Sequence, residues 1–159
     1  MPDYYISAQA VPNDPQYQQQ WGLPQVGAPA AWKTSTGSAA AGAANTPVTV
    51  CVIDSGVDPT HPDLAANLHP DIGLNAWAPG SPVNDSTGHG SHCAGVIAAV
   101  GNNGLGMAGM AWGGEVKVLS CSFMGPGGYG MTSTVVECFS YCIRWVRGGG
   151  GRRQGWYTD

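Results

Sequence analysis

The sequence predicts an α/β fold built on a parallel sheet, and three stretches of the chain carry that prediction. Residues 48–53 form an unbroken run of β-branched and apolar side chains, which is typical of a parallel strand buried on both faces. Residues 115–124 form a second apolar run that predicts another parallel strand. Between them, residues 93–100 are small and apolar, the composition of a helix that is buried on every side. Two parallel strands joined through a helix form a βαβ unit.

The other expected elements follow from local composition. Residues 1–20 are polar and interrupted by prolines, and residues 34–46 are rich in Gly, Ala and Ser, as in a surface connection. A short helical turn is expected at residues 62–68 and a strand at residues 71–77. Apolar side chains at helical spacing predict an amphipathic helix over residues 131–146. Its apolar stripe is formed by Val135, Cys138, Phe139, Cys142 and Trp145 or Val146.

Length and charge limit the classes of function. A chain of 159 residues suggests one domain, and 43% hydrophobic residues suffice for a core. Two lysines against nine acids give residues 1–143 a charge of −7, and four arginines against one acid give residues 144–159 a charge of +3. This acidic body argues against nucleic acid as a partner. No apolar run reaches the roughly 18 residues of a membrane helix, and no secretory signal is recognised, so composition does not indicate a compartment.

The chain contains five cysteines, and an odd number leaves at least one without a partner in the chain. Cys51, Cys93 and Cys121 lie in apolar runs and are expected to be small core thiols. Cys138 and Cys142 are four residues apart on one predicted helix. That spacing suits a zinc pair, but no second Cys or His pair at a suitable spacing accompanies them.

Polar side chains follow the first apolar run and precede the predicted inner helix. Asp54 comes directly after the strand, at the carboxyl end where α/β sheets place ligands and catalytic groups. Residues 85–87 are helix-starting residues, His89 follows them, and His92 lies on an adjacent face. An Asp that orients an imidazole and a His that accepts a proton are the orienting and base members of a nucleophilic triad. Either motif alone is weak, because a strand-end Asp is common and His-x-x-His also suits a structural pair or a metal site.

Both motifs resemble those of the subtilases, the subtilisin-like serine proteases. Residues 52–58, Val-Ile-Asp-Ser-Gly-Val-Asp, are similar to the Asp motif of that family, and His-Pro-Asp-Leu follows at residues 61–64. Residues 88–95, Gly-His-Gly-Ser-His-Cys-Ala-Gly, are similar to its His motif. The resemblance implies that Asp54 and His89 are catalytic, in the family order Asp, His, Ser. It also implies a partial subtilisin-like fold, a parallel sheet with helices on both faces.

The resemblance defines the expected domain organisation. Residues 1–146 would be the amino-terminal part of a subtilase catalytic domain, and residues 11–146 carry the resemblance. Within it, residues 28–32 would form a short helix that packs Trp32. Residues 147–159, rich in Gly and Arg, would be a tail unrelated to the family.

A glycine-rich segment follows the second apolar run, and by itself it is typical of a flexible turn. The resemblance implies instead an extended edge that pairs with the backbone of a protein or peptide substrate, which glycines allow to approach closely. Met124 and Tyr129 would line a subsite for a bulky apolar side chain. The implied substrate-binding residues are Met124, Gly127, Gly128, Tyr129 and Gly130.

A calcium site is implied by the same resemblance. Calcium takes about six to eight oxygen ligands, and the loop of residues 101–109 offers an Asn side chain and several carbonyls. The implied Ca²⁺ ligands are Asp14, Asp63, Asn103 and the carbonyls of Leu105 and Met107. A plain Asn-Gly turn explains the loop without an ion.

Two later subtilase motifs, the oxyanion-hole Asn and the Gly-Thr-Ser-Met-Ala nucleophile motif, do not occur in the 159 residues. Ser133 falls at the start of the helix after the substrate edge and is interpreted as a helix cap. The leading hypothesis is therefore a serine endopeptidase whose Asp and His are present and whose Ser is not. The isolated chain is expected to be inactive, and a carboxyl-terminal half to complete it.

Two alternatives remain open at this point. One is a non-catalytic fragment that binds calcium or a peptide. The other is a metal hydrolase that uses His89 and His92 together with Asp54. The family resemblance alone suggests a secreted or vacuolar location.

Overall fold

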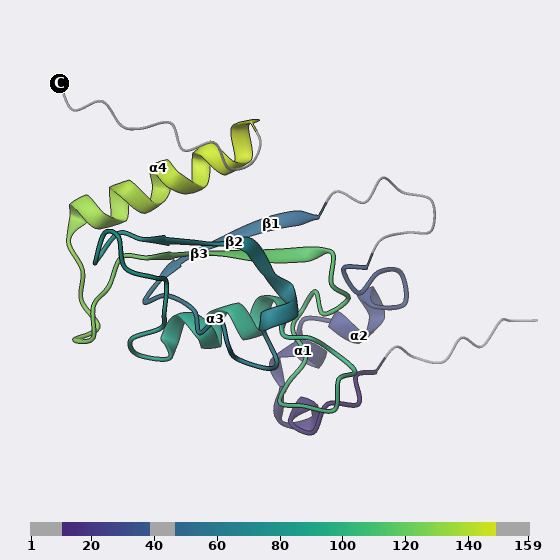
Figure 1. The fold of residues 1–159 in the computed structure, drawn as a ribbon. Helices are drawn as coiled ribbons and strands as arrows, with labels where there is room; N and C mark the ends of the chain where they lie inside the picture. The colour runs from purple at the N-terminus through teal and green to yellow at the C-terminus, as the bar shows by residue number, and fades with distance from the viewer. Residues whose placement is uncertain (1–10, 39–46, 149–159) are drawn as a thin grey trace, which may run out of the picture.

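A three-stranded parallel sheet lies between two helices in the computed structural model of this protein (Figure 1). The structure describes residues 11–38 and 47–148, with the backbone alone at residues 146–148. The sheet order is β1-β3-β2. The strands are β1 (Val48–Asp54), β2 (Leu68–Asn75) and β3 (Val116–Ser122). The predicted α/β fold with a parallel sheet is confirmed.

The two strands predicted from apolar runs pair directly with each other. Their parallel register runs from Val48 opposite Val116 to Asp54 opposite Ser122, so both strands end at the same edge of the sheet. Burial of β1 on both faces was expected, and that expectation is wrong in part. Val52 is buried, but Val48 is 62% exposed, because β3 is the single neighbour of β1 among the described residues.

β2 begins and ends earlier than the sequence predicts, and its pairing is interrupted. Its register with β3 shifts between Leu68 and Gly73, and Ile72 has a left-handed φ of 57°. A Cβ at Gly73, where φ is 147°, would overlap the carbonyl of Ser120. The strand therefore contains a bulge that needs glycine, and a regular alternation of apolar residues does not reveal such a bulge.

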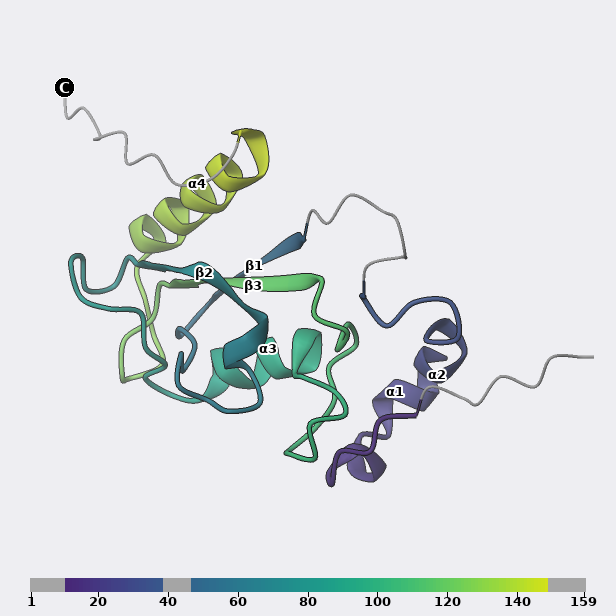
Figure 2. The ribbon, with the colours of Figure 1, turned by 45° about the vertical axis from the view of Figure 1, so that its right-hand side comes forward.

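Helix α3 (His89–Ala98) covers one face of the sheet (Figure 2). Its small residues, among them Ala94 and Ala98, are buried against a core that includes Val52 and Val118. The prediction that this helix is buried on every side is wrong. Its outer side is exposed, with Val96 46% accessible, because the sheet covers the other side alone.

Helix α4 (Thr132–Gly148) covers the opposite face and is tied there by two disulfides. Cys142 pairs with Cys51 of β1, with the Cα atoms 6.0 Å apart, and Cys138 pairs with Cys121 of β3 at 5.6 Å. The expectation of core thiols is therefore wrong for Cys51 and Cys121. Both strand cysteines face α4 and pair with Cys138 and Cys142, which lie four residues apart on that helix. Cys93 is free.

The start of α4 also differs from expectation. Ser133 lies inside the helix, so its interpretation as the cap is wrong. Thr134 accepts a hydrogen bond from the Met131 backbone N–H at 3.2 Å and donates to the carbonyl of Phe123 at 3.0 Å. The predicted apolar stripe holds for the two cysteines but not for Phe139, which is 55% exposed.

The segment before β1 forms a small core of its own beside the sheet (Figures 1 and 2). Trp32 is 4% exposed there, and its Nε1 donates a hydrogen bond to the Met110 carbonyl at 2.8 Å. The predicted short helix before Trp32 is confirmed. The short helices of the chain are η1 (Tyr17–Gln19), α1 (Gly22–Gln25), α2 (Ala28–Ala31) and η2 (Ala65–Asn67). Most of the expected tail, residues 149–159, lies outside the described residues.

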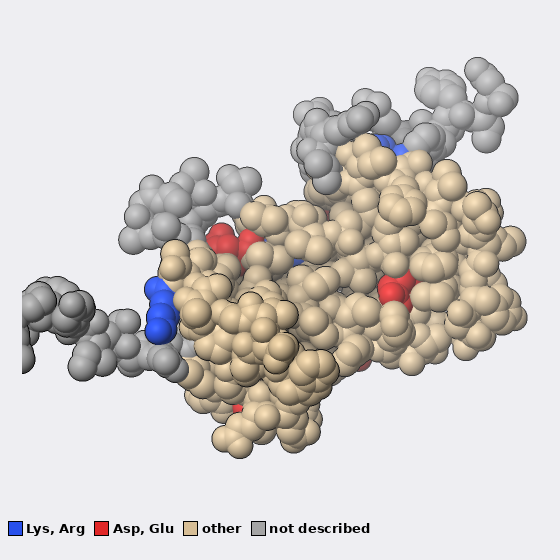
Figure 3. Space-filling model, turned by 180° about the vertical axis from the view of Figure 1, so that it is seen from behind, with Lys and Arg blue, Asp and Glu red and all other residues tan. Residues whose placement is uncertain are grey.

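Charged side chains are sparse and separated on the face shown in Figure 3. This agrees with a charged content of 10%. Within the described residues, no helix combines the length and the apolar character needed to cross a membrane.

Removal of each disulfide should show how much it contributes to holding α4 against the sheet. The Cys51–Cys142 bond spans 91 residues, and the Cys121–Cys138 bond spans 17. From loop-closure entropy we expect the double change Cys51→Ser with Cys142→Ser to lower the free energy of unfolding by about 4 to 5 kcal/mol. For Cys121→Ser with Cys138→Ser we expect about 3 kcal/mol. Urea unfolding measures both, with Cys93→Ser as the control. A chain whose stability is unaffected by reductant would contradict the pairing.

Candidate active site

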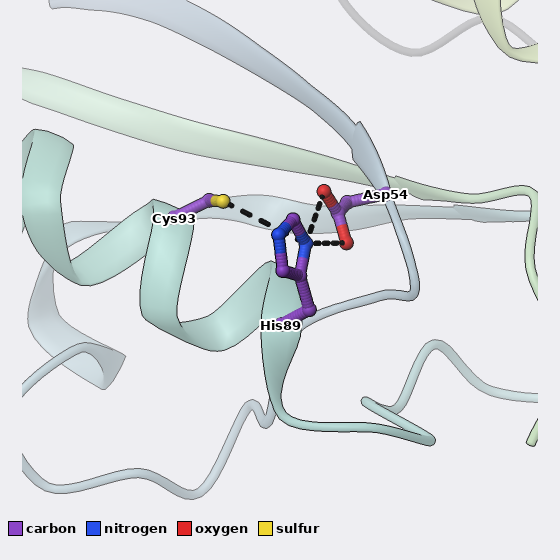
Figure 4. A group of neighbouring side chains, drawn as sticks. All are labelled: Asp54, His89 and Cys93. Carbon is purple, nitrogen blue, oxygen red and sulfur yellow. Dashed lines mark hydrogen bonds and ion pairs between the residues drawn. The ribbon is translucent and has the colours of Figure 1, made fainter. Parts of the chain in front are cut away.

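Asp54 and His89 are in direct contact where a strand end meets a helix start (Figure 4). Asp54 is the last residue of β1, and His89 is the first residue of α3. His89 Nδ1 lies 2.8 Å from Asp54 Oδ1 and 2.9 Å from Oδ2. The Asp54 side chain is 13% exposed and that of His89 is 66% exposed. The carboxylate is thus sheltered behind an imidazole that faces solvent.

Two backbone N–H groups hold Asp54, one at its carboxylate and one at its main-chain carbonyl. The Ser55 N–H donates to Asp54 Oδ1 at 2.7 Å, and the Phe123 N–H donates to the Asp54 carbonyl at 2.9 Å. Gly90 lets the first turn of α3 approach closely, because a Cβ there would overlap the carbonyl of Gly56 and lie 3.2 Å from Asp54 Cβ.

A second carboxylate, Asp85, holds the start of α3. It accepts hydrogen bonds from the backbone N–H groups of Thr87, Gly88 and Ser91 at 3.0, 2.8 and 2.8 Å. The hydroxyl of fully buried Ser55 donates to Asp85 at 2.7 Å and accepts from the Gly90 N–H at 3.0 Å. The sequence indicated residues 85–87 as a helix start, but it did not reveal this link from Ser55 across 30 positions.

The surroundings of Asp85 and His89 favour the charged form of each side chain. Burial acts to raise the pKa of Asp85, but hydrogen bonds from Ser91, Thr87 and Ser55 together lower it to about 2. The hydrogen bond from His89 to Asp54, and then the charge of Asp54, raise the pKa of His89 above its ordinary value. An imidazole held by a carboxylate in this way can act as a general base and can carry the resulting positive charge.

Cys93, one turn along α3, completes a group that sequence reasoning did not assemble. Its Sγ lies 3.8 Å from His89 Nδ1. Ligand atoms of Asp54, His89 and Cys93 lie within 4.8 Å of one another. His92, the third ligand in the alternative metal hypothesis, does not belong to this group, and Cys93 takes that place among the described residues. The i, i+4 spacing of His89 and Cys93 was the available signal.

The glycine-rich segment after β3 is a closed turn and not extended backbone. Met124 and Gly130 form an antiparallel bridge, and the Gly125 N–H donates to the Tyr129 carbonyl at 3.1 Å. Tyr129 is 69% exposed, and its ring lies perpendicular to that of Trp77 at a centroid distance of 6.1 Å. Gly127 and Gly128 form the exposed tip. The segment leaves the sheet next to Asp54, whose carbonyl accepts the Phe123 N–H.

Two buried carboxylates flank the loop of residues 101–109. Asp14 is 4% exposed and Asp63 is 2% exposed. Asp14 accepts hydrogen bonds from the backbone N–H of Asn103 and of the residue before it, at 3.2 and 2.8 Å. Asp63 accepts from the Asn103 side-chain amide at 2.8 Å and from the Met107 N–H at 2.9 Å. Asn103 therefore links the two carboxylates.

The loop closes directly over one carboxylate. Gly106 has a φ of 39°, and a Cβ there would overlap the carboxylate of Asp63. The Leu105 N–H donates to Asn103 Oδ1 at 2.8 Å. The residues of the implied calcium site thus lie together around one loop, and their donor set consists of carboxylate, amide and carbonyl oxygens.

Comparisons with known proteins agree with this geometry. A profile of the Subtilase family matches residues 45–137. Thermitase from Thermoactinomyces vulgaris is 35% identical over 136 residues, which cover 82% of this chain and 43% of thermitase. The halolysin-like extracellular serine protease Nep from Natrialba magadii is 29% identical over 137 residues, which cover 82% of this chain and 24% of Nep.

A solved structure shows the same likeness in three dimensions. A structure described as proteases from Pseudoalteromonas arctica matches with a TM-score of 0.66 and 30% identity, over 92% of this chain and 47% of that chain. The chain spans less than half the length of each of these relatives. The family profile covers more than half of this chain and includes both the strand that ends at Asp54 and the helix that begins at His89, so the protein belongs to the subtilase family of serine proteases.

Proposed function

We propose that this chain supplies the acid–base pair of a serine endopeptidase that hydrolyses peptide bonds in proteins or peptides. Asp54 orients His89, and His89 is the general base. The nucleophilic serine comes from residues outside these 159. The contact of 2.8 Å between His89 Nδ1 and Asp54, placed at the carboxyl edge of a parallel sheet, is the observation that carries this proposal.

The geometry supports a specific division of roles. With the Nδ1–H donated to Asp54, the neutral imidazole has its lone pair at Nε2, where it accepts the proton of a serine hydroxyl. Asp54 then stabilises the imidazolium, in keeping with the raised pKa of His89. His89 returns the proton to the leaving amine. The proton passes through His89 alone, and Asp54 acts by orienting the imidazole.

We infer that the isolated chain does not turn over a peptide substrate. The serines inside the two motifs have other partners. Ser55 bonds Asp85, and the hydroxyl of Ser91 accepts the Asp58 N–H at 2.9 Å. Ser133 lies within α4. In subtilisin, loss of the serine costs a factor of about 10⁶ in kcat.

The turn at residues 124–130 is the proposed contact for a peptide substrate, although it is closed and not the extended edge that the resemblance implies. Its tip is exposed, so its backbone is available to a peptide, and the segment starts beside Asp54. The exposed Tyr129 ring against Trp77, together with Met124, would form a wall for a bulky apolar side chain.

We also propose that Asp14, Asp63, Asn103 and the carbonyls of Leu105 and Met107 hold a structural calcium ion. Buried carboxylates carry a desolvation cost that a cation offsets, and the donor set is the one that calcium prefers. The ion would pin the segment before β1 to the loop that follows α3. This site also suits the alternative of a non-catalytic calcium-binding fragment.

The disulfides indicate the kind of compartment in which this protein folds. Two of them within one small fold indicate an oxidising environment. The name of one relative describes an extracellular protease. We propose that this chain also follows the secretory route.

Asp54→Asn should move the pKa of His89 back towards its ordinary value of 6.5, because it removes the charge that favours the imidazolium. A group whose pKa is raised by folding adds stability that is fully present below the unfolded-state pKa. That stability is lost as the pH rises through the folded-state pKa. The stability difference between wild type and variant should thus shrink as the pH rises through the raised pKa of His89. NMR titration of the imidazole measures the pKa. Asp71→Asn, which alters a carboxylate beside His69, is the control. An unchanged His89 pKa in Asp54→Asn would contradict the proposed coupling between Asp54 and His89.

Labelling by a fluorophosphonate tests whether the nucleophilic serine lies outside this chain, because the reagent requires a reactive serine. The 159-residue chain should remain unlabelled. A longer protein, translated from the downstream coding sequence as far as a Gly-Thr-Ser nucleophile motif, should be labelled. In that longer protein, His89→Ala should lower kcat by about 10⁶. His92→Ala, on an exposed neighbouring position, should keep activity. Labelling of the short chain would contradict the inferred inactivity. Labelling that survives His89→Ala would contradict the proposed base.

Calcium removal should lower the melting temperature, and added calcium should restore it. At a free calcium concentration about 100 times the Kd, the ion adds about 2.7 kcal/mol to the free energy of unfolding. Asp63→Asn should abolish this response, whereas Asp71→Asn should preserve it. Scanning calorimetry with and without chelator measures the shift, and identical melting curves for wild type would eliminate the site.

A further inference from the structure

Three kinds of metal ligand converge at the start of α3 (Figure 4). They are the carboxylate of Asp54, the imidazole Nδ1 of His89 and the thiol of Cys93. Oxygen, nitrogen and sulfur donors of these types together are the ligand set of zinc. Calcium and magnesium prefer oxygen donors alone, so this site differs in chemistry from the loop of residues 101–109.

The separations of the donor atoms suit a single small ion. Zinc bonds of about 2.0 to 2.3 Å in a tetrahedron place neighbouring ligand atoms roughly 3.3 to 3.7 Å apart. The Nδ1–Oδ1 distance is 2.8 Å and the Sγ–Nδ1 distance is 3.8 Å, values on either side of that range. Small side-chain rotations therefore bring all three donors to an ion placed among them.

We propose that Asp54, His89 and Cys93 form a zinc-binding site with water as the fourth ligand. Three protein ligands with one open position are typical of an accessible zinc site. Solvent reaches this one, since the His89 side chain is 66% exposed.

The fold holds these ligands in place before any ion arrives. His89 and Cys93 are at i and i+4 on α3, the spacing at which one helix face presents two zinc ligands. The Ser55 N–H fixes the carboxylate of Asp54 at 2.7 Å. Asp85 adds negative charge near both His89 and Cys93.

Zinc binding and the proposed base function exclude each other. The ion bonds Nδ1 in place of its proton, and the imidazole then carries its proton on Nε2. Nε2 can no longer accept the proton of a hydroxyl. Formation of the zinc–sulfur bond releases the thiol proton to solvent. This inhibitory consequence rests on the proposed function, but zinc binding itself does not.

Zinc titration of the full 159-residue chain tests the site. The chain is first treated with chelator and then saturated with calcium, so that oxygen-donor sites are filled. Competition with a chromophoric chelator should show one zinc per chain. Cys93→Ser should weaken zinc binding by at least about 100-fold, because loss of a ligand costs more than loss of an outer contact. His92→Ala, one position away from Cys93, should bind zinc as wild type does.

Two measurements on the wild-type chain keep the test independent of variant folding. Cobalt in place of zinc should give a thiolate-to-cobalt charge-transfer absorption, and zinc should protect Cys93 from alkylation by iodoacetamide. Absence of the absorption, unprotected Cys93, or zinc affinity that survives both Cys93→Ser and His89→Ala would overturn the proposal. None of these readouts requires protease activity, so failure of the fluorophosphonate test would leave the zinc result standing.

Discussion

The close approach of two backbones, the turn after β1 and the first turn of α3, is the constraint on which the site depends. A Cβ at Gly90 would overlap the Gly56 carbonyl, and a Cβ at Gly56, where φ is 112°, would overlap the carbonyl of Asn84. A side chain at Gly90 would push the first turn of α3 away from the strand end, and a side chain at Gly56 would displace the loop that leads into α3. The contact between Asp54 and His89 would then open. Glycine is needed at both positions, so that one carboxylate and one imidazole can meet.

A polar network converts this close approach into a fixed geometry. Ser55 is fully buried and bridges Asp85 to the Gly90 N–H, so the turn after β1 and the first turn of α3 share one hydroxyl. Ser122, at the end of β3, donates to the Ser55 carbonyl at 2.9 Å and joins the central strand to the same junction. Buried networks of this kind are costly when one member is missing and rigid when all are satisfied. The exposed imidazole of His89 is therefore positioned by a network in which Ser55, Gly90 and Ser122 are buried.

The sequence allowed prediction of what is local and missed what depends on tertiary placement. Asp54 at a strand end and His89 at a helix start follow from short motifs, and the parallel sheet follows from two apolar runs. Cys51 looked like a core thiol because its partner, Cys142, lies 91 positions away on a helix whose docking face was unknown. Burial of α3 was overestimated because small apolar residues permit close packing on one side without requiring cover on the other. The group around Cys93 could not be predicted, since i, i+4 spacing gives the adjacency of His89 and Cys93 but not the approach of Asp54.

The two faces of the sheet divide the tasks of this fold, and β1 takes part in both. Cys51 faces α4 and is covalently tied to it, Val52 faces the core beneath α3, and Asp54 ends the strand. Alternation along a strand sends neighbouring side chains to opposite faces. The disulfide therefore restrains the strand that carries the carboxylate without entering the junction where His89 meets it. The contact between Asp54 and His89 involves only β1 and α3, with β3 fixing the register of β1. This accounts physically for how a chain that spans less than half of its relatives still brings the two groups into contact.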